Sequence, residues 1–139
     1  MEIDRSFRLG AGHDFVSVRV RGLRTDDVTT WVPSDVEIVA GAFSGSFSAD
    51  FEKEDFVSFR HALHELYAFR EGEASFHTVE GQLAIEIRGD YKGHFEALVT
   101  AMDASGIGNK LAAMLHFDQT ELVPTMRDLD AICAALTRA

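Results

Sequence analysis

The chain has 139 residues, 46% of them hydrophobic, and a net charge of -10 from 23 acidic and 13 basic side chains. This length suits one domain, so we expect residues 1–139 to fold as a single unit around one core. The acidic balance argues against direct binding to nucleic acid or to anionic membranes, because phosphate groups would be repelled. The sequence shows neither the apolar run of a signal peptide nor the roughly 20 apolar residues of a membrane span, which predicts a cytoplasmic protein.

The negative charge is concentrated in one stretch of the sequence. Residues 35–80 contain ten acidic and only three basic side chains, whereas residues 1–34 are neutral overall. Such a surface attracts basic proteins over a distance of about 8 Å in physiological salt, the Debye length. The distribution therefore predicts a basic protein as the partner.

The first elements in chain order are expected to be strands. Between Asp14 and Phe51 the apolar residues alternate with polar ones in three groups, which predicts about three strands. The groups are Val16, Val18 and Val20, then Val36 and Ile38, then Phe43, Phe47 and Phe51. Residues 22–35 are expected to form the longest loop. Arg19, Arg21 and Arg24 are the only local concentration of basic side chains, and we expect them to pair with the acidic part of the molecule.

A helix is predicted over residues 53–69, where apolar side chains recur every three or four residues. They are Phe56, Phe59, Leu63, Leu66 and Tyr67. Gly72 follows the last turn and is expected to end the helix in the left-handed conformation. His61 and His64 share a helix face, but the order H-A-L-H-E matches neither zinc-binding helix motif, so we interpret both as surface residues and expect no metal site.

Alternation returns in four runs, at residues 74–79, 83–88, 93–102 and 110–118, and a second helix is predicted over residues 120–137 with Thr120 as its N-cap. Cys133, the only cysteine, falls among the apolar positions of that helix and is expected to be buried. Because strands and helices do not alternate regularly, an antiparallel arrangement is favoured. The predicted fold class is α+β, with a curved, mostly antiparallel sheet of about seven strands and two α-helices.

Strand parity places six polar residues on the outer face of the C-terminal hairpins. They are His77, Glu86, His94, Glu96, His116 and Asp118. One interpretation is that cross-strand pairs satisfy one another on an exposed sheet. The alternative is a small ligand-binding protein or enzyme in which His77, Glu86, His94 and His116 line a pocket. No catalytic or cofactor-binding motif is recognised, and unpaired sheet edges leave a homodimer open.

Several segments together resemble a known bacterial family. They are F-S-G-S-F-S-A-D-F from Phe43, E-D-F-V-S-F-R-H-A-L-H-E-L-Y in the first predicted helix, G-E-A-S-F, G-Q-L-A-I-E-I-R-G-D-Y-K-G-H, and L-H-F-D-Q-T-E-L before the last helix. Over roughly residues 35–137 the sequence resembles the WapI-type immunity proteins. The landmarks are the F-x-G strand, the helix ending in Leu66-Tyr67, the glycine-punctuated hairpins and Asp118-Gln119-Thr120.

The resemblance implies a non-catalytic protein that neutralises a toxin. Toxins of this kind often carry a nuclease domain, which must be basic to hold phosphate, and an acidic inhibitor would be steered towards it. On this hypothesis six carboxylates on and beside the first helix would provide the steering. They are Glu52, Glu54, Asp55, Glu65, Glu71 and Glu73.

Overall fold

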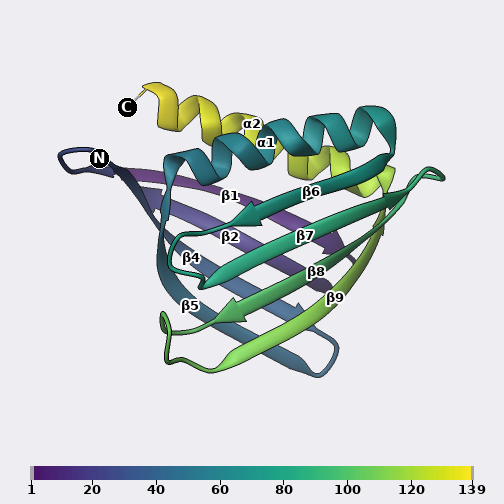
Figure 1. Ribbon diagram of the computed structural model, residues 1–139, viewed down its shortest axis with the longest axis horizontal. Coiled ribbons are helices and arrows are strands. Elements are labelled where there is room, and N and C mark those ends of the chain that lie inside the picture. Colours follow the sequence, from purple (N-terminus) through teal and green to yellow (C-terminus); the bar gives the residue numbers. More distant parts are fainter. Residues whose placement is uncertain (1, 139) are drawn as a thin grey trace.

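The structure is a computed structural model that describes residues 2–138 (Figure 1). Its strands are β1 (Glu2–Ala11), β2 (Asp14–Gly22), β3 (Arg24–Thr25), β4 (Thr30–Ala40), β5 (Phe43–Glu52), β6 (Glu71–His77), β7 (Leu83–Asp90), β8 (His94–Met102) and β9 (Lys110–Asp118). The helices are α1 (Lys53–Phe69) and α2 (Gln119–Arg138). One antiparallel sheet has the order β1-β2-β4-β3 with β5 paired to β4, and the other has the order β6-β7-β8-β9.

The α+β class is confirmed, and the first helix has the predicted bounds. The described residues form nine strands in two sheets, whereas about seven strands in one curved sheet were expected. The prediction of a loop over residues 22–35 is wrong, because β4 begins at Thr30. Pro33 is tolerated within β4 because it lies in a gap between two partner strands on the same side. Thr30 and Trp31 pair with β3, and pairing with β2 begins at Ser34. No ladder hydrogen bond is needed from it on that side.

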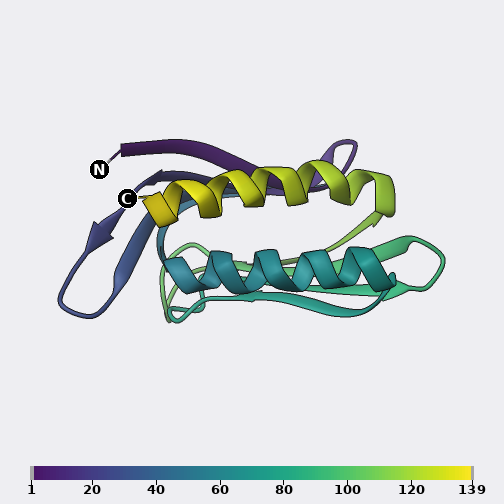
Figure 2. The same cartoon turned by 90° about the horizontal axis from the view of Figure 1, so that it is seen from above.

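The two sheets face each other, and the helices cover one end of the pair (Figure 2). Each helix packs on the first strand of the other half of the chain, α1 on β6 and α2 on β1. The Thr125 hydroxyl in α2 donates a hydrogen bond to the carbonyl of Arg8 in β1. The free edges of β1 and β6 are thereby covered, whereas β5 and β9 lie at the end away from the helices (Figure 1).

An aromatic cluster joins the sheets and α1. The ring of Phe76 in β6 lies 5.4 to 6.3 Å from four other buried rings. They are Phe7 in β1, Phe51 in β5, and Phe56 and Phe59 in α1. Cys133 is buried in α2, as predicted, and this burial raises the pKa of its thiol. The buried side chains of both sheets and both helices form one continuous core.

Acidic residues cap both helices. Glu52 is the N-cap of α1, and its backbone N–H donates to the Asp55 carboxylate at 2.9 Å in a capping box. Asp118 caps α2 in the same way, because it accepts from the Glu121 N–H while Glu121 accepts from the Asp118 N–H. The prediction of Thr120 as the cap is therefore wrong. Arg70, with φ of 59°, takes the left-handed position at the end of α1 that was assigned to Gly72.

Candidate recognition surface

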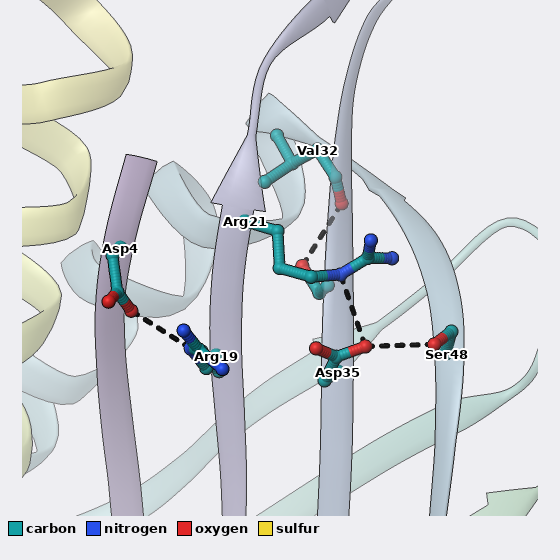
Figure 3. Close-up of polar contacts among 7 residues, drawn as sticks. Asp4, Arg19, Arg21, Val32, Asp35 and Ser48 are labelled. Atoms are coloured by element: carbon teal, nitrogen blue, oxygen red, sulfur yellow. Dashed lines mark hydrogen bonds and ion pairs between the residues drawn. The ribbon is translucent and has the colours of Figure 1, made fainter. Parts of the chain in front are cut away.

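The outer face of the five-stranded sheet carries arginines that are paired with aspartates (Figure 3). Arg19 lies 2.9 Å from Asp4, and this hydrogen bond and charge lower the pKa of Asp4. Arg21 lies 3.1 Å from Asp35, which also accepts a 2.8 Å hydrogen bond from the Ser48 hydroxyl. Arg24 lies 3.7 Å from Asp50. Two of the three arginines thus pair within residues 35–80, as predicted, and the third pairs with Asp4.

The outer face of the four-stranded sheet has a different balance of charge. The strand register aligns two polar rows across it. The first is Glu71, Asp90, His94 and Asp118, and the second is Glu73, Arg88, Glu96 and His116. With Glu86 this face carries six carboxylates, and among residues 2–138 only Glu73 of these has a guanidinium partner, Arg88 at 3.1 Å. Most of the negative charge on this face therefore lacks a permanent cation beside it.

The histidines of this face lie where strand parity predicted, but they do not converge. His77 lies 3.5 Å from Glu86, and His94 lies 3.3 Å from Asp90. His116 is on β9, two strands from Glu86, and faces Glu96 across the β8–β9 pair. These side chains are exposed, and among residues 2–138 no three His, Cys, Asp or Glu side chains are grouped so that they could hold a metal ion. The arrangement therefore fits cross-strand pairing better than a ligand pocket.

The six carboxylates predicted to steer a partner do not form one surface. Glu52 and Asp55 belong to the cap of α1, where burial is the main cause of a raised pKa of Asp55. Glu54 is exposed in the first turn, and Glu65 pairs with His61 at 3.1 Å. Glu71 and Glu73 lie beyond the other end of this 17-residue helix, a distance of about 25 Å. Only Glu71 and Glu73 join the outer face of the four-stranded sheet.

Two exposed aromatic residues beside Glu71 were missed by the sequence analysis. Phe69 at the end of α1 and Tyr91 in the β7–β8 turn are each 69% exposed. The Tyr91 N–H donates to the Arg70 carbonyl at 2.9 Å, and both residues have positive φ. A hydrogen bond to the Glu71 carboxylate raises the pKa of the Tyr91 hydroxyl. A tyrosine within the turn sequence D-Y-K-G was the only signal available, because bulky residues are uncommon at such positions.

We define the Tyr91 surface as Phe69, Glu71, Asp90 and Tyr91. Asp118 lies beside it but caps α2. Although desolvation opposes it, hydrogen bonds from the N–H groups of Lys92 and His94 lower the pKa of Asp90. The Thr120 hydroxyl and the Glu121 N–H lower the pKa of Asp118. These hydrogen bonds favour the ionised forms of Asp90 and Asp118. Non-glycine residues with positive φ concentrate at functional sites, where surrounding contacts hold them in place.

Exposed aromatic side chains such as Phe69 and Tyr91 are of the kind enriched at protein–protein interfaces. The chain belongs to the immunity protein WapI-like family, whose family model matches residues 7–137. The resemblance predicted over residues 35–137 is confirmed and extends into β1. No curated protein matches the chain. Within residues 2–138 neither helix has the length and apolar character needed to cross a membrane.

Proposed function

We propose that this protein is a non-catalytic immunity protein that binds a basic, nuclease-type toxin domain in the cytosol through the Tyr91 surface. The observation that carries the proposal is the placement of exposed Phe69 and Tyr91 beside Glu71 and Asp90, carboxylates that have no arginine partner in the part of the chain that the structure describes. Membership of an immunity protein family supports binding to a toxin.

The two kinds of residue have different roles in this proposal. Carboxylates on the outer face of β6–β9 raise the encounter rate with a basic domain, and salt weakens this effect. Tyr91 and Phe69 supply the desolvated anchors, because aromatic residues at the centre of an interface carry most of the binding free energy. Glu71 is both a steering charge and the partner that orients the Tyr91 hydroxyl. Of the carboxylates predicted from the sequence, Glu71 contributes most, since Glu52 and Asp55 cap α1 and Glu73 is paired with Arg88.

The test is affinity capture from lysate and secreted fractions of the source cells at 50 and 300 mM salt, with wild-type protein and the variant Tyr91→Ala as bait. The expected result is the capture of one basic protein. Its recovery should be lower at 300 mM than at 50 mM salt, and lower with Tyr91→Ala than with the wild type as bait. Its C-terminal domain is then expressed alone and together with the immunity protein. Growth arrest that co-expression relieves supports the proposal, and a captured protein without this effect, or none at all, contradicts it.

A further inference from the structure

The cleft at the uncovered end of the two sheets is a second surface suited to binding. Among the described residues β5 pairs only with β4 and β9 only with β8, so each has an edge without a partner strand. A cleft of about 200 Å³ lies between them. Its apolar lining is Ile38, Phe43, Gly45, Phe47, Ala101 and Leu111. Its polar lining includes Asp103 and Lys110, one charge of each sign. A cavity of about 150 Å³ can hold a benzene-sized group, so a large aliphatic side chain fits here.

Gly45 keeps this cleft open, and its own backbone does not require glycine. Its φ is not in the left-handed region, and a Cβ atom would meet only Ile38 Cγ2, at 3.9 Å. Gly89, in contrast, has Arg70 O only 2.7 Å from the position of a Cβ, so glycine is needed there. A glycine inside a strand costs stability relative to alanine. Contacts within the chain therefore do not explain the empty position between Phe43 and Phe47.

The first seven residues of β5, 43–49, also lack the usual protection against strand pairing, whereas Asp50 and Glu52 near its end are charged. Residues 43–49 contain no charged side chain and no proline, although natural edge strands commonly carry lysine or proline. Exposed N–H and C=O groups of such an edge bind an extended chain, while pockets beside it select alternate side chains. The chemistry of this surface thus fits an extended peptide segment.

We propose that an extended segment of the toxin adds a strand to β5 and places an aliphatic side chain over Gly45. This inference rests on the proposed function and names a second contact with the same partner. Exposed Glu37, opposite Ser46 in the register, has no ion-pair partner among the described residues. It lies two strands from the added segment, about 10 Å away, within reach of an arginine or lysine. A second copy of this chain would bring the same net charge of -10 and is disfavoured.

The test compares Gly45→Leu with Ser6→Leu, which places the same side chain on the outer face of β1, an edge strand that α2 covers. The probe is a catalytically inactive form of the captured toxin. Gly45→Leu is expected to keep the thermal midpoint of the wild type and to weaken toxin binding at least about 100-fold. Ser6→Leu is expected to bind within about threefold of wild type.

Hydrogen exchange of the wild-type complex tests strand addition without any variant. Amides of residues 43–49 are expected to exchange at least about tenfold more slowly when toxin is bound, and those of β1 are expected to be unchanged. This inference is overturned if toxin leaves the exchange of residues 43–49 unaltered, or if Gly45→Leu binds toxin as tightly as the wild type does. Either result leaves the proposed function standing. A wild-type dimer that Gly45→Leu dissociates identifies a second copy as the occupant and also overturns it. Absence of toxin binding by the wild type overturns both proposals.

Discussion

The two halves of the molecule have the same order of elements, yet their outer faces differ in charge. Four long strands are followed by a helix in residues 2–69 and again in residues 71–138. On the first sheet, aspartates pair with Arg19, Arg21 and Arg24. On the outer face of the second sheet, one of six carboxylates has an arginine partner within the described residues. The two halves therefore share an architecture, whereas the carboxylates without an arginine partner are concentrated on the outer face of the second.

The exchange of helices shows how the halves depend on each other. Because α1 packs on β6 and α2 packs on β1, neither half covers the edge of its own first strand. Phe76 extends this dependence into the core, since its ring contacts residues of the first sheet and of α1. We therefore expect both halves to unfold in one cooperative transition.

The largest expected effect is that of Phe76→Ala on folding. Removing this buried ring leaves a cavity among four others, and we expect a loss of about 3–5 kcal/mol in the free energy of unfolding. Phe43→Ala is the control, because the Phe43 ring is 69% exposed. We expect it to change the free energy of unfolding by less than about 0.5 kcal/mol. Urea unfolding followed by fluorescence and circular dichroism measures both. Two separate transitions in either variant would show that the halves fold independently.

The sequence predicted the elements that depend on local pattern. The apolar stripe of α1 and the hairpins from residue 71 onwards needed only periodicity and glycine positions. β1 was missed because only Phe7 and Leu9 of its inner face are fully buried, and its stability comes from β2 and α2. The division into two sheets could not be predicted either, because strand spacing does not reveal which strands pair.

The candidate site was predicted only in part. Carboxylates near α1 are close in sequence, but helix capping occupies Glu52 and Asp55. The Tyr91 surface depends on the meeting of Arg70 and Tyr91, which are distant in sequence, through a backbone hydrogen bond. Composition alone does not reveal that contact. The parity of the strands did predict correctly that Glu86, His94 and Glu96 share the outer face.

The second effect, on binding, distinguishes the Tyr91 surface from other exposed apolar residues. Tyr91→Ala is expected to weaken toxin binding by about 2 kcal/mol or more, roughly 30-fold, because a desolvated aromatic anchor is lost. Val79→Ala is the matched control, since Val79 is 71% exposed in the loop between β6 and β7. Isothermal titration calorimetry measures both affinities. If both variants lose the same affinity for the toxin, or if Tyr91→Ala loses none, Tyr91 is not an anchor of the interface.

A smaller effect is expected from the carboxylates of the two outer faces. The triple variant Glu71→Gln, Glu86→Gln and Glu96→Gln and the control Asp4→Asn, Asp35→Asn and Asp50→Asn each remove three negative charges. The first is expected to slow association with the toxin about tenfold at low salt, and the control less than about threefold. Stopped-flow measurements at several salt concentrations separate the two. If both variants slow association equally, total charge and not its placement attracts the toxin.

The smallest effect concerns Asp130, which links the exchanged helices. Its carboxylate lies 2.6 Å from Arg60 Nε and 2.8 Å from His64 Nε2, both in α1, and is about half exposed. Although desolvation opposes them, the hydrogen bonds from His64 and Arg60 lower the pKa of Asp130. Because solvent screens this pair, Asp130→Asn is expected to cost only about 0.5–1 kcal/mol.

The pH dependence shows whether these bonds stabilise the folded state. A carboxyl whose folded pKa lies below its unfolded value of 3.8 adds stability above that value, and the contribution disappears as the pH falls through the folded pKa. The difference between wild type and Asp130→Asn should therefore be present above pH 3.8 and shrink as the pH falls below that value. Glu65→Gln removes an ion pair within α1 alone, and we expect a loss of at most about 0.5 kcal/mol. Equal losses for Asp130→Asn and Glu65→Gln would mean that apolar packing alone holds the exchanged helices together.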